Sequence, residues 1–235
     1  MGGACSSRRE GDNEAGTSYE GLCAAVESKL GLYKIDITEF EVVLDEVSYK
    51  KDAIDLDTLS DVFVRFGVLR SEFLSKDGPF IIFYNGLVGT IEEDKGFILS
   101  ASLPFCKGKM LDKKNVLWRC LMTTEKNYIK WNELIELIKM MIVTTVKIIP
   151  EMVYDNEIGN IDTNIQTLID ATEEELNDYA RQYFPGTPRD KNMVHRHEFD
   201  EWLLRPESDG VFSPTHHRKS FLAYLNTKKI AEPPS

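Results

Sequence analysis

A nine-residue motif occurs twice in the chain, and both copies have a glutamate at the same position. The two copies are KNYIKWNEL, residues 126–134, and KNMVHRHEF, residues 191–199, and the shared glutamates are Glu133 and Glu198. Each glutamate follows a β-branched residue by four positions and precedes a large apolar residue. A twelve-residue calcium-binding loop ends in this way, with a carboxylate that can give both oxygens to the ion. The chemistry that these residue types could do is therefore cation ligation.

The other ligand positions of these loops hold unsuitable residue types. A calcium loop also takes oxygens from positions 1, 3, 5, 7 and 9, and an apolar residue at position 8 pairs with a second loop. With Ile129 and Val194 at position 8, the loops span residues 122–133 and 187–198. Positions 1, 3 and 5 are then Met122, Thr124 and Lys126 in one loop and Thr187, Arg189 and Lys191 in the other. An alternative interpretation of both glutamates is that each begins a helix, where its charge favours the positive end of the helix dipole.

Helices are predicted on both sides of these loops. Apolar residues recur at helical spacing before residue 122 and after residue 133. They are Leu117, Trp118, Leu121, Leu134, Leu137, Ile138 and Met141. This pattern predicts crossed helix pairs, with Ile129 beside Val194 in a short β-bridge. It also predicts that Trp118, Leu137 and Met141 line a groove for an apolar helix, although core packing is the competing interpretation of each methionine.

Two weaker copies of the unit precede these. KDAIDLDTL, residues 51–59, places Ile54 at position 8, and SKDGPFIIFYNGL, residues 75–87, contains a turn at Asp77 and Gly78. Brief strands are therefore expected near Ile54, Ile81, Ile129 and Val194. Residues 96–110 and 144–164 read as insertions before the third and fourth units. The tail from Pro206 has loop composition, with one short helix expected around residues 221–225.

The repeated organisation resembles a known family. From about residue 35 to residue 204 the chain is similar to the four-EF-hand proteins of the recoverin and frequenin group, the neuronal calcium sensors, with calcineurin B and the calcium- and integrin-binding proteins as relatives. The resemblance rests on the apolar frame, the β-bridge positions and the two closing glutamates. It implies calcium sensing, whereas the residues at the ligand positions argue for weak or lost calcium binding.

The first residues carry a lipidation motif. MGGACSS satisfies M-G-x-x-x-[Ser/Thr], so Gly2 is the candidate for N-myristoylation and the adjacent Cys5 is a candidate for S-palmitoylation. One myristoyl chain binds membranes only marginally, so stable attachment needs the second chain. An acylated arm ahead of EF-hands is also what the family resemblance implies. The alternative is a disordered N-terminus with a chance match.

Composition limits the function classes. A net charge of −11, from 39 acids and 28 bases, disfavours nucleic acid and favours cationic partners such as basic helices. The four cysteines have no C-x-x-C spacing and the start of the chain has no apolar signal segment, which indicates a reducing, cytosolic compartment. No nucleophile and base pair is evident, so no enzyme activity is expected. The histidines at 195, 197, 216 and 217 are expected to be solvent-exposed side chains.

Together these observations predict an all-α protein of four EF-hand-like helix–loop–helix units in two lobes. The expected division is a flexible acylated arm at 1–17, an N-terminal lobe at 18–105, a C-terminal lobe at 106–205 and a tail at 206–235. The expected function is that of an adaptor at the cytoplasmic face of a membrane that docks an amphipathic helix of a partner. The alternative is a true calcium sensor that uses non-standard loops to regulate a membrane-associated target.

Overall fold

The chain is mostly helical, which confirms the all-α class. The computed structural model describes residues 18–49, 54–88, 94–121, 128–156, 162–182, 192–205 and 210–231. Within these ranges the sheet consists of two short strands, β1 Tyr128–Lys130 and β2 Met193–His195. The arm, with Gly2 and Cys5, lies outside the described residues, as do most of the two loops before β1 and β2.

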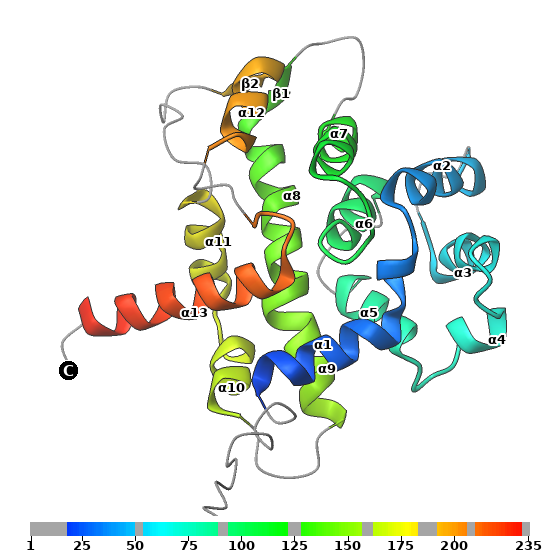
Figure 1. The fold of residues 1–235 in the computed structure, drawn as a ribbon, viewed down its shortest axis with the longest axis horizontal. Helices are drawn as coiled ribbons and strands as arrows, with labels where there is room; N and C mark the ends of the chain where they lie inside the picture. Colours follow the sequence, from blue (N-terminus) through cyan, green and yellow to red (C-terminus); the bar gives the residue numbers. More distant parts are fainter. Residues whose placement is uncertain are drawn as a thin grey trace, which may run out of the picture.

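A long helical rod runs through the centre of the molecule (Figure 1). It consists of α8 Trp131–Val143, a five-residue π-helical turn η2 Thr144–Ile148, and α9 Ile149–Asn156. All but one of the side chains from Leu137 to Ile142 are buried, because neighbouring helices cover the rod on several sides. Residues 144–156, the first part of the segment expected to be an insertion, continue this helix.

The N-terminal helices lie mostly on one side of the rod, and the first of them crosses it at α9 (Figure 1). They are α1 Tyr19–Leu30, the 3-10 turn η1 Leu32–Lys34, α2 Ile37–Val47, α3 Leu56–Arg65, α4 Arg70–Phe73, α5 Pro79–Val88, α6 Lys95–Ser102 and α7 Met110–Leu121. Short polar side chains begin several of them: Asp36 accepts a hydrogen bond from the Thr38 N–H, and Asp55 accepts one from the Thr58 N–H. Asp36 also forms a parallel β-bridge with Lys107.

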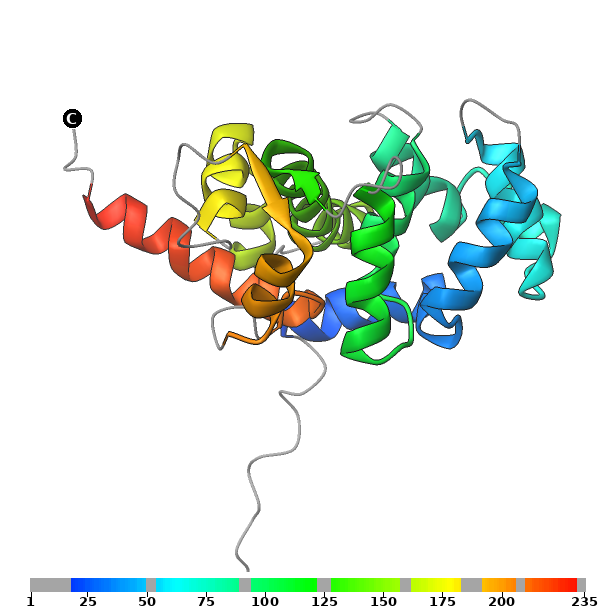
Figure 2. The ribbon, with the colours of Figure 1, turned by 90° about the horizontal axis from the view of Figure 1, so that it is seen from above.

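The C-terminal helices cover the other side. They are α10 Thr163–Ile169, α11 Glu173–Gln182, α12 Arg196–Leu203 and α13 Pro214–Ala231. The molecule is elongated, with α13 at one end and the α2–α4 region at the other (Figure 2). Helix α13 is much longer than the short helix expected at residues 221–225, so the prediction of loop structure around that helix is wrong. It begins in the ordinary way, with Ser213 accepting from the His216 N–H and Pro214 in the first helical position.

Two of the expected strands are absent from the described residues. The segment around Ile81 is helix α5, whose Phe80, Phe83, Tyr84 and Leu87 are buried. These residues recur at helical spacing, so the helical period decides the structure over the β propensity of the individual residues. Near Ile54 the chain is not in a strand, because Asp55 already caps α3.

A single cluster of buried apolar side chains extends from Cys23 in α1 to Leu225 in α13. Helix α1 packs against α9, and α13 packs against η2. The contacts of the core thus cross the expected boundary between residues 105 and 106. The start of α13 therefore meets α1 next to the π-helical turn.

Candidate functional site

The two paired strands lie where the repeated motif predicts them. β1 and β2 are antiparallel, with Ile129 opposite Val194, and each of these side chains is 1% exposed. The Trp131 N–H donates to the Asn192 carbonyl at 3.1 Å and extends the pairing by one bond. This confirms the predicted pairing of Ile129 with Val194.

The two closing glutamates both contact the protein. Glu133 accepts a hydrogen bond from the ammonium group of Lys130 at 2.7 Å, and this bond raises the pKa of Lys130. Glu198 accepts from the backbone N–H of His195 at 2.9 Å, in the first turn of α12. Both carboxylates therefore stabilise the start of a helix, as the alternative interpretation expects. Among the described residues, no cluster of three histidine, cysteine, aspartate or glutamate side chains could hold a metal ion.

The residues predicted to line a partner groove lie in the core. Trp118, Leu137 and Met141 are 3%, 4% and 0% exposed. The ring of Trp118 packs against Phe199 with 5.2 Å between centroids, and the guanidinium of Arg196 lies 5.1 Å from the Trp118 ring centroid. Helices α6 and α11 pack against α8, which carries the other two residues. A partner helix reaches these side chains only if a covering helix moves.

The π-helical turn exposes a backbone carbonyl to another helix. The Ile149 N–H donates to the Thr144 carbonyl, five residues earlier, so the next bond in this register would join Pro150 to Thr145. Proline has no N–H, and the Thr145 carbonyl instead accepts from Nη1 of Arg218 in α13, at 3.4 Å. Pro150 therefore accounts for the irregular turn, and α13 contacts a carbonyl within it.

Arg218, near the start of α13, connects this helix to α1. Its side chain is 0% exposed, and its Nη1 donates to Oε1 of Glu27 at 2.6 Å. Its Nε and Nη2 donate to the carboxylate of Glu20, with the shorter contact, from Nη2, at 2.8 Å. The pKa of Glu27 is raised, because the effect of burial exceeds the opposing effect of Arg218. One buried guanidinium thus faces two carboxylates of α1, and the cluster carries one surplus negative charge.

Sequence reasoning did not single out Arg218, and the expectation that its neighbour His217 is solvent-exposed is wrong. His217 is fully buried rather than solvent-exposed, and its Nε2 lies 2.7 Å from the Val211 carbonyl. Burial lowers the pKa of His217 to about 4. The signal that could have found both residues is the start of α13, a serine followed by proline, together with the helical spacing of His217, Phe221 and Leu225.

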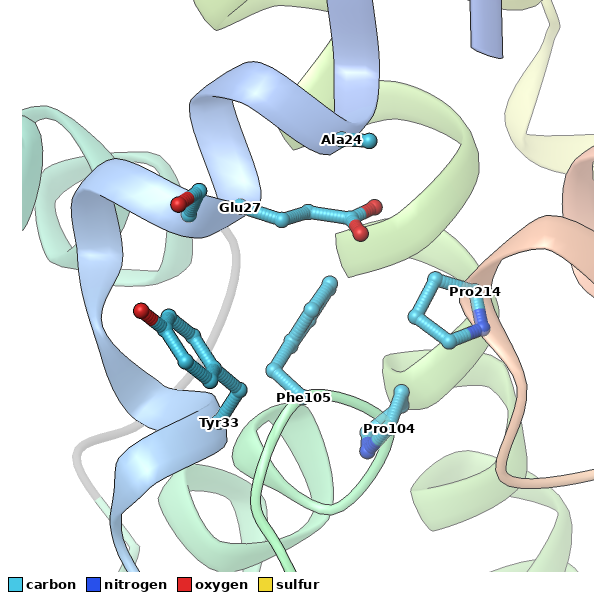
Figure 3. Close-up of a pocket in the computed structure, with 7 residues that line it drawn as sticks. Ala24, Glu27, Tyr33, Pro104, Phe105 and Pro214 are labelled. Atoms are coloured by element: carbon cyan, nitrogen blue, oxygen red, sulfur yellow. The ribbon is translucent and has the colours of Figure 1, made fainter. Parts of the chain in front are cut away.

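A pocket of about 410 Å³ adjoins this charged cluster (Figure 3). Four separate segments line it. Its residues are Ala24, Glu27 and Ser28 of α1, Tyr33 of η1, Pro104 and Phe105 between α6 and α7, and Pro214 of α13. Phe105 is 7% exposed and packs edge-on against Phe83, with centroids 5.9 Å apart. The side chain of Glu27 extends past Phe105 toward the start of α13 (Figure 3).

A second pocket, of about 470 Å³, lies between α2, α6 and α7. Its charges are compensated within the protein. Arg119 donates to both oxygens of Glu41, at 2.8 and 2.5 Å, and Lys95 pairs with Asp45. Asp94 accepts from the Gly96 N–H and caps α6. We assign no ligand to this pocket.

Comparisons with known proteins add no identification. No family model, curated protein or solved structure matches this chain. Among the described helices, none combines the length and the apolar character that a bilayer crossing requires.

Proposed function

We propose that the chain is a membrane-tethered adaptor of four EF-hand-like units in two lobes, which docks a basic amphipathic helix of a partner protein and folds without calcium. The observation that supports this proposal is the Ile129–Val194 bridge beside two closing glutamates that each contact protein groups. Positions 1, 3 and 5 of both loops carry no carboxylate, so the loops lack most of the charged ligands of a calcium site. Here the apolar frame and the bridge join the two units, and the role is one of binding rather than catalysis.

The partner's chemistry follows from charge. The net charge of −11 attracts basic segments and repels acidic ones. Because Trp118, Leu137 and Met141 are buried, docking at this face requires that the helices around α8 open. Opening would move Trp118 away from Phe199 and Arg196, so tryptophan fluorescence reports the event.

The docking proposal is tested with two designed helical peptides that share one leucine face. One peptide carries lysines on its polar face and the other carries glutamates, and both are titrated in a calcium chelator and then in excess calcium. We expect saturable binding of the lysine peptide alone, with the same affinity in both conditions. Replacing Trp118 with Phe should remove most of the fluorescence change without removing binding. Calcium-dependent binding would instead support the calcium sensor, and equal binding of both peptides would contradict charge selection.

Attachment to the cytoplasmic face of a membrane is tested separately at Gly2 and Cys5. The intact mass of the protein isolated from eukaryotic cells should show one myristoyl and one palmitoyl group. Gly2→Ala should abolish membrane association, and Cys5→Ser should reduce it, because a single acyl chain binds only marginally. An unmodified N-terminus in the native protein would contradict this part of the proposal.

A further inference from the structure

We propose that the pocket formed by α1, η1, the α6–α7 connection and the start of α13 binds a lysine side chain of a partner protein, with Glu27 accepting from its ammonium group. This inference deepens the proposed function, because it names a contact that the partner makes. The pocket lies apart from the β1–β2 bridge and from the buried face of α8 (Figures 1 and 3).

The surplus negative charge at the pocket favours a cationic ligand. Arg218 offsets one of the two carboxylates of α1, so one negative charge is left over. Glu20 faces Arg218 with both oxygens, whereas Glu27 uses Oε1 alone. Its Oε2 accepts no hydrogen bond from the part of the chain that the structure describes. Glu27 lines the pocket and its side chain is 20% exposed, so the surplus charge is accessible there.

The shape of the acceptor favours lysine over arginine. A guanidinium binds a carboxylate best through two parallel hydrogen bonds, and Arg218 already occupies one oxygen of Glu27. A single remaining oxygen suits an ammonium group, which is a compact point charge.

The walls fit the aliphatic stem of a lysine. Pro104 and Phe105 are buried and rigid, and Pro214 and Tyr33 complete an apolar rim. Long charged side chains bury their methylene groups along surfaces of this kind. The ammonium group of Lys34 lies 5.6 Å from the centroid of the Tyr33 ring, so we assign to Tyr33 a contact with the stem rather than with the charge.

A protein partner fits this pocket better than a lipid headgroup. The chain carries a net charge of −11, and the cytoplasmic leaflet is itself negative, so this acidic pocket is repelled from that surface. A basic protein segment is attracted by the same charge and brings its lysine to the pocket.

The pocket is tested by NMR on the full chain with Nα-acetyl-lysine methylamide as the probe. We expect saturable shifts at the amides of Ser28, Tyr33 and Phe105. Nα-acetyl-norleucine methylamide has a similar stem without the charge and should bind about tenfold more weakly, since one charged hydrogen bond is lost. The arginine analogue should bind more weakly than the lysine compound.

Two matched glutamine variants distinguish a direct contact with Glu27 from the general effect of the cluster's negative charge. Glu27→Gln and Glu20→Gln remove the same charge from the cluster, but only Glu27 lines the pocket. We expect Glu27→Gln to weaken lysine binding about tenfold and Glu20→Gln less than about threefold. Should Glu27→Gln fail to fold, Ala24→Leu fills the pocket from its exposed rim while both carboxylates keep Arg218, and it should also abolish the shifts.

Three outcomes would overturn the inference. They are equal binding of the lysine and norleucine compounds, equal effects of the two glutamine variants, and the same shifts produced by phosphatidylcholine vesicles but not by the lysine compound. Because the probe is a single amino acid, its failure leaves the docking of a helix untouched. Conversely, a helix that does not dock leaves the pocket result intact.

Discussion

At the scale of single residues, Arg218 is a buried charge that connects α13 to α1 and to the π-helical turn. A fully buried guanidinium is stable only where carboxylates and carbonyls satisfy its donors, and here Glu20, Glu27 and Thr145 do so. We predict that Arg218→Met lowers the free energy of unfolding by about 3–5 kcal/mol, because it leaves two partly buried carboxylates facing each other. Denaturant titration followed by circular dichroism measures this.

The neighbouring lysine provides the control for Arg218. Lys219 is exposed, and Lys219→Met should change the free energy of unfolding by no more than about 0.5 kcal/mol. The triple variant in which Glu20, Glu27 and Arg218 are all neutral should be more stable than Arg218→Met alone. A loss below about 1 kcal/mol for Arg218→Met would show that the cluster contributes little to stability.

His217 makes stability depend on pH. Its pKa is lowered to about 4 by burial, whereas in the unfolded chain it lies near the usual histidine value of 6.5. Between these values the unfolded chain binds a proton that the folded chain does not. Stability is therefore fully present above pH 6.5 and is lost as the pH falls toward 4. The shift corresponds to a loss of about 3 kcal/mol from this one group.

A variant that cannot titrate isolates this effect. His217→Gln keeps a side-chain amide that can donate to the Val211 carbonyl, and it carries no charge at any pH. The difference in unfolding free energy between the native protein and this variant should shrink as the pH falls from 6.5 to 4. A difference that stays constant over that range would mean that His217 does not couple folding to protonation.

At the scale of elements, local patterns predicted some features and missed others. The β1–β2 pairing could be predicted because the repeated motif places a β-branched residue, Ile129 or Val194, at the same position of each strand. Helix α5 was missed, because the high β propensity of FIIFY masked the helical spacing of Phe80, Phe83, Tyr84 and Leu87. The Arg218 contacts lie beyond any local pattern, because Glu20 and Glu27 are 198 and 191 residues away in the chain.

The π-helical turn and α13 are predicted to be energetically coupled. Pro150→Ala supplies an N–H that can donate to the Thr145 carbonyl, the same acceptor that Arg218 contacts. In a double-mutant cycle, Arg218→Met should then cost about 1 kcal/mol less in the Pro150→Ala background, the net contribution of one hydrogen bond. Strictly additive free energies would show that the proline and the arginine act independently.

At the scale of the whole molecule, the shared core predicts one cooperative unfolding transition. Cys23 and Leu225 belong to the same buried cluster, and α1 packs against α9 while α13 packs against η2. Opening the N-terminal helices would therefore expose the Arg218 cluster and one face of the central rod. The cost of that exposure opposes separate unfolding of either half.

Two probes with different locations test this cooperativity. Trp118, Trp131 and Trp202 all lie between residues 106 and 205, so tryptophan fluorescence follows that half, whereas circular dichroism follows all the helices. The two denaturant curves should coincide in midpoint and slope. If the dichroism curve has two phases and fluorescence follows only one, the lobes unfold independently. In that case the contacts among α1, α9 and α13 would contribute too little free energy to couple them, and the large effect expected for Arg218→Met would be confined to one phase.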